Sequence, residues 1–196
     1  KVSDNNKVYT ITVRNDAVCS DGEKLTAKDV AFSYNLIAES STWVDYSFFE
    51  NATAIDDTNV KITLKKPNSL FKHIMAMTAI IPQHAYNKET YGQNPVGAGP
   101  FMMKQWDKGE KMILEANPNY YGKKPQVNQI TFLFVNTDTA LALAQRGEVD
   151  VARLSVNLGD RNVKGYNKKI VSAKDSLAIY MPSIPYGSME KDGLLL

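Results

Sequence analysis

The sequence predicts a mixed α/β fold. Residues 59–65 alternate apolar and polar side chains, as a half-buried strand does, and a capped apolar stripe follows Thr26, as in an amphipathic helix. Further along the chain, a helical segment lies between two apolar runs of strand length. With 196 residues, 43% of them apolar, the chain can bury a hydrophobic core and form one large domain or two small ones.

The first expected elements are a strand, a turn and a helix. Residues 7–14 alternate and are rich in β-branched and aromatic side chains, which predicts a strand. The Asp-Gly pair at residues 21–22 predicts a turn. Thr26 and Asp29 form a capping box with Asp in place of the usual Glu, and the apolar stripe behind it predicts a helix over residues 27–39.

A hairpin and two short helices are expected next. Residues 49–55 and 59–65 are joined by a short polar turn, and the alternation in the second run predicts a hairpin with one solvated face. Apolar residues after a proline predict a short helix near residues 70–75, and Pro82 introduces another near residues 83–87. The first 90 or so residues therefore predict a small mixed unit.

The second half of the chain predicts further strands. Residues 100–106 and 111–116 are two strand candidates joined by a turn. Residues 127–135 are apolar on both faces, so we expect a central strand there.

A strand–helix–strand crossover is expected after that strand. Thr137 or Asp138 can cap a helix that ends at Gly147, and residues 149–152 predict the strand that follows it. Residues 176–181 are the last strand candidate.

Composition and charge exclude several classes of function. Lys and Arg total 23 against 21 Asp and Glu, and the basic residues are scattered, which argues against a nucleic-acid or membrane-surface binder. No run of about 18 apolar residues predicts a membrane span. A single cysteine excludes an internal disulfide framework. The polar start has no signal-peptide pattern, which we interpret as a start inside a longer protein.

Gly97 and Gly99 pose a choice between a phosphate-binding loop and framework. No Gly-Lys-Ser/Thr ending follows them, there is no third glycine at dinucleotide spacing, and Pro100 leads into a strand instead of a helix N-terminus. We therefore interpret them as glycines that permit tight backbone geometry between two subdomains.

The remaining candidates for chemistry are weak. His73 and His84 have a spacing that matches no zinc motif. Cys19, between a strand and a turn, is expected to be a small buried residue and not a nucleophile. A Ser-His-Asp arrangement stays open, because its members need not be adjacent in sequence, although no Gly-x-Ser-x-Gly elbow is present. We expect no catalytic residue, no metal site and no cofactor.

Large amphipathic rings favour a binding surface. Trp43 and Tyr46 lie in the polar segment after the first helix, where a strand core would not require them, so binding and packing are equally open. Three methionines could line an adaptable pocket, although gap-filling in a core is the more common use of this residue: Met75, Met77 and Met103.

Three blocks, in order, carry a family resemblance. They are YTITVRNDAVCSDGEKLTAKDVAFSYN at residues 9–35, NPVGAGPFMMKQWDKGEKMILEANPNYYGKKP at residues 94–125, and ITFLFVNTDTALALAQRGEVDVA at residues 130–152. These blocks resemble the peptide/nickel-type (family 5) solute-binding proteins of ABC importers, over residues 7–185. The resemblance implies a type II periplasmic-binding-protein fold, with two α/β lobes on a hinge and an extra subdomain on the first lobe.

The resemblance also assigns parts of the chain. Residues 1–92 would be the extra subdomain of lobe one, residues 93–187 part of the α/β core of that lobe, and residues 188–196 the start of a hinge or tail. The opening strands of lobe one and the whole second lobe would lie outside this segment.

The function implied by the resemblance is capture of an extracytoplasmic solute, above all an oligopeptide or dipeptide, without chemistry. A monomeric protein in the periplasm, or a lipoprotein at the cell surface, would deliver the solute to a membrane permease powered by an ATPase. The residues expected to line the cleft on the lobe-one side are Trp43, Tyr46, Met77, Thr78, Tyr180 and Ser183. Residues 180–187 depart from the asparagine-containing stretch of relatives, which puts the contact at Ser183 in doubt.

Two alternatives stay open. A sensor domain of the same fold could belong to a receptor or regulator, and a signal or lipoprotein segment upstream would favour transport over sensing. A hydrolase is the remaining option, and turnover of a peptide panel that depends on one serine would revive it.

Overall fold

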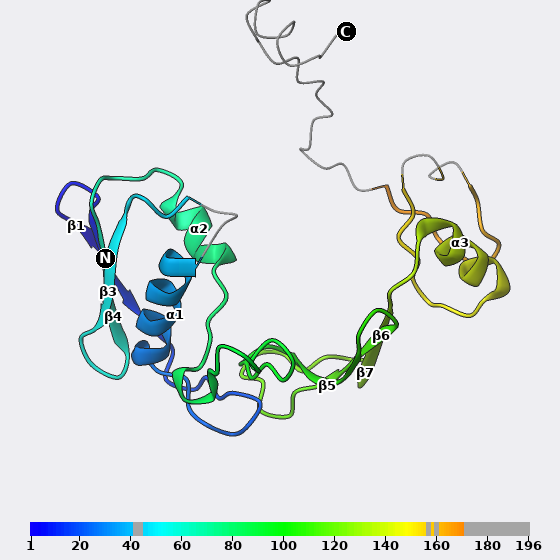
Figure 1. Ribbon diagram of the computed structural model, residues 1–196, viewed down its shortest axis with the longest axis horizontal. Helices are drawn as coiled ribbons and strands as arrows, with labels where there is room; N and C mark the ends of the chain where they lie inside the picture. Colours follow the sequence, from blue (N-terminus) through cyan, green and yellow to red (C-terminus); the bar gives the residue numbers. More distant parts are fainter. Residues whose placement is uncertain (41–44, 156–157, 159–160, 171–196) are drawn as a thin grey trace, which may run out of the picture. The chain divides into compact units, whose positions relative to one another are not determined.

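The computed structural model describes residues 1–40, 45–155, 158 and 161–170 (Figure 1). The chain divides into two compact units, Lys1–Val135 and Asn136–Leu196. None of the helices in the described residues has the length and apolar character needed to cross a membrane.

The first unit begins with a four-stranded antiparallel sheet. Its strands are β1 (Val2–Ser3), β2 (Val8–Thr12), β3 (Phe49–Ala54) and β4 (Asn59–Leu64), in the order β1-β2-β4-β3. The predicted strand at residues 7–14 and the predicted hairpin are confirmed. The two-residue strand β1 was not predicted, because its sequence is polar and too short to alternate.

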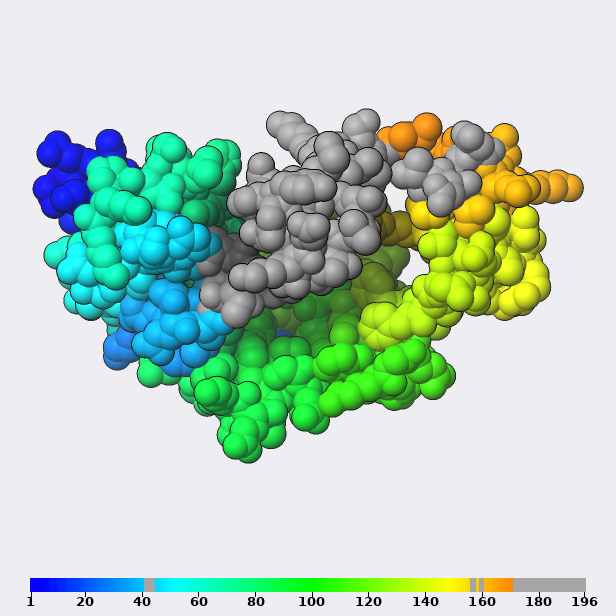
Figure 2. Space-filling model, turned by 45° about the horizontal axis from the view of Figure 1, so that its top comes forward, coloured from blue at the N-terminus to red at the C-terminus, as the bar shows by residue number. Residues whose placement is uncertain are grey.

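Helix α1 (Ala27–Ser40) packs on this sheet, and the predicted capping box opens it. The Asp29 carboxylate accepts hydrogen bonds from the backbone N–H of Thr26 at 2.7 Å and from the Thr26 hydroxyl at 2.9 Å. Helix α2 (Phe71–Met77) lies on the same side of the sheet, and the short 3₁₀ helix η1 (Gln83–Ala85) follows it (Figure 1). In the space-filling view, the blue atoms of α1 adjoin the cyan atoms of the β3–β4 hairpin (Figure 2).

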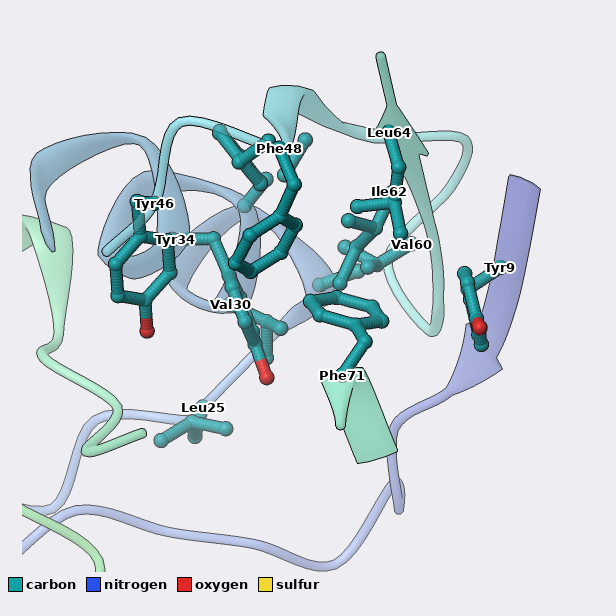
Figure 3. Packing of buried hydrophobic residues seen from close by; sticks show 14 of the residues in the cluster. Tyr9, Leu25, Val30, Tyr34, Tyr46, Phe48, Val60, Ile62, Leu64 and Phe71 are labelled. Carbon is teal, nitrogen blue, oxygen red and sulfur yellow. The ribbon is translucent and has the colours of Figure 1, made fainter. Parts of the chain in front are cut away.

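The core of the first unit lies between the sheet and the helices, and it is rich in aromatic rings. Phe71 of α2 is fully buried, and its ring makes edge contacts with Tyr9, at 4.8 Å between centroids, and with Phe48, at 5.8 Å. Figure 3 shows Phe71 facing Phe48 and the β4 side chains. Those β4 side chains are Val60, Ile62 and Leu64, the buried face of the predicted hairpin.

A side-chain amide joins α1 to the edge of the sheet. Asn35 donates from Nδ2 to the Ala52 carbonyl at 2.9 Å and accepts from the Ala52 N–H at 3.0 Å. Because β3 is an edge strand, these Ala52 groups would otherwise lack a partner strand.

A second, three-stranded antiparallel sheet completes the first unit. Its strands are β5 (Phe101–Asp107), β6 (Lys111–Ala116) and β7 (Gln129–Leu133), in the order β5-β6-β7. The prediction of a central strand at residues 127–135 is wrong for this sheet, because β7 lies at its edge. Its apolar side chains are accordingly exposed, with Phe132 at 49%.

The carbonyl groups of the glycine segment accept hydrogen bonds from residues that lie before and after it in the chain. Gly97 O accepts from Ser20 N at 2.9 Å, and Gly99 O accepts from Nδ2 of the buried Asn117 at 2.9 Å. Neither glycine has a positive φ, and an added Cβ would meet no close atom at Gly97 and only Phe101 O, at 3.7 Å, at Gly99. The predicted tight backbone geometry is therefore wrong, while the predicted place of this segment between two subdomains stays a prediction.

The second unit holds helix α3 (Thr137–Arg146). Its N-cap is Asn136, whose Oδ1 accepts from Thr139 N at 2.8 Å, so the predicted caps lie one and two residues too far along the chain. Gly147 ends the helix with φ 72°, as predicted. Residues 149–152 form no strand, because no neighbouring strand pairs with them in the described part of the chain. The candidate strand at residues 176–181 lies outside the described residues.

Candidate functional site

Three of the predicted binding residues lie within the described part of the chain, and the structure brings them together. Tyr46, Met77 and Thr78 meet at the C-terminal end of α2. The others, Trp43, Tyr180 and Ser183, lie outside the described residues.

Tyr46 belongs to the hydrophobic core and not to an exposed loop surface. Its side chain is 9% exposed, and its ring stacks on Phe48 at 5.8 Å and meets the edge of Phe49 at 6.2 Å. Only the hydroxyl group reaches out of the ring cluster, and it lies 3.0 Å from Oγ1 of Thr78. The ring therefore anchors the hydroxyl in place.

Thr78 is the centre of a small hydroxyl cluster. Its Oγ1 donates to the Ile74 carbonyl at 2.8 Å and lies 3.0 Å from the hydroxyl of Tyr46, and the Thr78 side chain also influences the hydroxyl of Tyr34. Figure 3 shows both tyrosine hydroxyls pointing to the same side of the core. Burial raises the pKa of Tyr34 to about 12, against a smaller opposite effect of the Thr78 side chain, so the Tyr34 hydroxyl stays neutral at neutral pH.

Tyr34 was missed by sequence reasoning. It lies on the apolar stripe of α1, where a tyrosine is read as core, and it is indeed 3% exposed. Nothing in the local sequence signals that its hydroxyl reaches residue 78, because the contact joins two separate helices.

Met77 contrasts with its neighbours. Its side chain is 85% exposed, whereas Ile74 and Met75 on the same short helix pack against the core. The helix ends there, and the backbone is extended at Thr78, with ψ 117°. An exposed, flexible thioether therefore stands beside the hydroxyl cluster.

Two backbone N–H groups of the segment after α2 bond it to α1. Ile81 N donates to Ser33 Oγ at 2.7 Å, and Gln83 N donates to Asp29 Oδ1 at 2.8 Å. Ahead of these bonds, the backbone groups of Ala79 and Ile80 make no hydrogen bond to any residue that the structure describes.

The 3₁₀ helix η1 is also held by a contact between His84 and Asp21. His84 Nε2 lies 2.7 Å from Oδ2 of Asp21. This hydrogen bond raises the pKa of His84, and it also lowers the pKa of Asp21, where burial acts in the opposite direction. Over the described ranges, no three His, Cys, Asp or Glu side chains gather as a metal site would require.

Two other hollows lie along α1 and β3, with volumes of about 450 and 630 Å³. The larger one reaches Tyr46 and is bordered by the charged side chains of Glu39, Glu50 and Lys65. Both are shallow surface features, and Asn35, which lines both, already bonds the strand edge between them. The end of α2 differs, because the backbone groups of Ala79 and Ile80 that follow it bond to no residue that the structure describes.

The arrangement suits binding of an uncharged group. An exposed thioether and backbone groups that bond to no described residue can contact an apolar side chain and an amide together. We define this surface, residues 77–80 with Tyr46 beneath it, as the Met77 surface.

Comparison with known proteins gives a consistent family. A model described as "Bacterial extracellular solute-binding proteins, family 5 Middle" matches residues 1–184. Protein XP55 of Streptomyces lividans is 32% identical over 195 residues, which are 93% of this chain and 36% of that protein. The probable D,D-dipeptide-binding periplasmic protein DdpA of Escherichia coli (strain K12) is 30% identical over 164 residues, 78% of this chain and 32% of that protein.

Solved structures agree. The crystal structure of NikZ from Campylobacter jejuni in complex with Ni(L-His) superimposes with a TM-score of 0.75 at 29% identity, covering 81% of this chain and 34% of NikZ. The predicted fold, part of a type II periplasmic-binding-protein architecture, is thereby confirmed. The chain spans about a third of the length of the curated relatives it matches.

Proposed function

Because the chain belongs to the bacterial extracellular solute-binding proteins of family 5, we propose that it is part of the substrate-binding component of an ABC importer. The intact protein captures an extracytoplasmic solute, an oligopeptide or dipeptide, and delivers it to a membrane permease driven by an ATPase. The observation that carries the proposal is the family match over residues 1–184. The names of relatives support a peptide or an amino-acid complex as the ligand, since DdpA is called a D,D-dipeptide-binding protein and NikZ is described in complex with Ni(L-His).

Capture works by closure of two lobes on the solute. The solute contacts both lobes only in the closed form, so binding shifts the hinge equilibrium by that difference in affinity. No bond in the solute needs to change. The uncharged groups of the Met77 surface bind the solute without reacting with it.

On this account, the described residues divide into contact and support. Met77 and the backbone of Ala79 and Ile80 contact the solute. Thr78 and Tyr46 act as positioning residues, because the Thr78 hydroxyl is already engaged by Ile74 and Tyr46. Other contacts on this lobe are proposed for Trp43, Tyr180 and Ser183, and the second lobe supplies the opposite wall.

The proposed domain division rests on the same two-lobed architecture. Residues 1–92 form most of an extra subdomain, residues 93–187 contribute to the core of the first lobe, and residues 188–196 lead on from it. A sensor protein of the same fold would use the same surface, so the test must include transport.

The test uses the intact protein and its host. Mass spectrometry of what co-purifies with the intact protein should identify a bound solute, and calorimetry should measure its affinity. Deletion of the protein should abolish uptake of that labelled solute, and restoring the protein should recover it. Normal uptake in the deletion strain, together with a changed transcriptional response to the solute, would favour the sensor instead.

A further inference from the structure

The Met77 side chain is exposed, whereas other apolar side chains of α2 pack in the core of the first unit. Ile74, Met75 and Ile80 pack against the core, and Phe71 of the same helix is fully buried. These contacts fix the helix end, while the Met77 side chain remains 85% exposed. A large apolar side chain placed on a firmly anchored support is available for an external partner.

The chain segment around Met77 carries no charge. Residues 74–83 contain no Asp, Glu, Lys, Arg or His, and the nearest ionisable side chain along the helix is His73, one turn before Met77. Asp29, which lies beneath the segment, already accepts bonds at both oxygens, from Thr26 and Gln83. A charged group brought against this segment would lose water without gaining a counter-ion from it, which is unfavourable.

Backbone groups next to Met77 are open to a partner. Within the described ranges, the N–H and C=O groups of Ala79 and Ile80 bond to no other residue, and the chain is extended at Thr78 on one side and Pro82 on the other. An extended peptide can pair its main chain with such a segment. Pairing would set the register and place one peptide side chain beside the thioether.

We propose that Met77 is a specificity-determining residue that selects peptides with an uncharged, apolar side chain at the position facing it. The inference rests on the proposed function and deepens it by naming the chemical class of the solute. A methionine suits the role because its flexible, polarisable side chain adapts to several apolar shapes while excluding charge.

The experiment uses the intact protein and an equimolar mixture of synthetic Ala-X-Ala tripeptides, in which X is each of the common residues. The protein is freed of bound solute, incubated with the mixture, and separated from unbound peptide by rapid filtration. Mass spectrometry then gives the bound fraction of each peptide. Three proteins are compared: wild type, Met77→Lys, and the matched control Met77→Leu. Melting temperatures check that all three are folded.

The wild type and Met77→Leu should retain peptides with X = Leu, Met or Phe at least about tenfold over those with X = Asp or Lys. Met77→Lys should lose that preference and gain peptides with X = Asp or Glu. If the wild type binds the peptides without this preference, or if Met77→Lys keeps it, the inference is wrong while the proposed function stands. If the wild type retains no peptide at all, the assignment of a peptide solute fails together with the inference.

Discussion

The hydroxyl of Tyr46 lies 3.0 Å from the hydroxyl of Thr78, although 32 residues separate them in the chain. The Tyr46 ring is packed between aromatic residues of the core, so its hydroxyl has little freedom to move. The contact therefore ties the end of α2, and the Met77 surface with it, to the rigid core of the first unit.

Tyr46→Phe should cost about 0.5–1.5 kcal/mol of unfolding free energy, because it removes one hydrogen bond and leaves the ring packing intact. Tyr46→Ala should cost more, about 3–5 kcal/mol, since the ring contacts are lost as well. Urea denaturation of the intact protein measures both. Equal costs for the two variants would show that the hydroxyl, and not the ring, provides the anchor.

Asn35→Ala should destabilise the first unit by about 1–3 kcal/mol, because it leaves the N–H and C=O of the buried Ala52 without partners. Asn35→Asp is the sharper variant. Its carboxylate faces the Ala52 carbonyl at neutral pH and repels it, whereas the protonated acid at low pH can donate to that carbonyl again. The difference in stability between wild type and Asn35→Asp should therefore shrink as the pH falls, and a constant difference would refute the assigned bond.

The His84–Asp21 contact should make stability depend on pH. The pKa of His84 is raised by its hydrogen bond to Asp21, so the contact stabilises the folded state fully below about pH 6.5, the ordinary histidine pKa. This contribution is lost as the pH rises through the folded-state pKa, and for a partly exposed pair it amounts to about 0.2–1 kcal/mol.

His84→Gln and Asp21→Asn should each remove that dependence. Thermal unfolding of the three proteins between about pH 5.5 and 8.5 covers the transition. The account is wrong for this pair if the difference between wild type and either variant grows as the pH increases.

Cys19 should resist alkylation in the native protein. Burial, with the nearby Asp21, Asp29 and Glu23 carboxylates, raises the pKa of the thiol to about 11, and its side chain is fully buried. Iodoacetamide at pH 8 should therefore modify Cys19 slowly when the protein is folded and quickly in urea. Peptide mapping locates the modification, and rapid native labelling at Cys19 would contradict the burial.

Much of the fold could be predicted because its signals are local. The capping box of Thr26 and Asp29 predicts the start of α1, and the alternation in residues 59–65 predicts the buried face of β4. The cap of α3 could not be chosen, since Asn136, Thr137 and Asp138 are all good N-cap residues and only the helix phase decides among them.

Sequence patterns did not predict features that depend on residues far away in the chain. Residues 127–135 are apolar on both faces, which predicts a central strand, yet a strand's place in a sheet is set by its neighbours and not by its own sequence. For the same reason, residues 149–152 have strand-like composition but form no strand in the described chain. Composition predicts the capacity to pair, and pairing needs a partner.

The candidate site could be predicted only in part. The sequence singled out Tyr46, Met77 and Thr78, but it suggested an exposed ring at Tyr46, which is a core residue. A loop lacks the periodicity that tells a buried side chain from an exposed one. The contact of Tyr46 with Thr78, and the Ala79 backbone that bonds to no described residue, arise from tertiary packing, which no local pattern encodes.

Hydrogen–deuterium exchange of the intact protein, with and without saturating Ala-Leu-Ala, tests the central claim most directly. The claim is that residues 77–80 form part of the solute-binding wall. The amides of Ala79 and Ile80, which bond to no described residue, should exchange quickly in the free protein and become protected on binding. The turn at residues 107–110 serves as the internal control and should not change. Protection confined to other segments, with residues 77–80 exchanging equally fast in bound and free protein, would contradict the account.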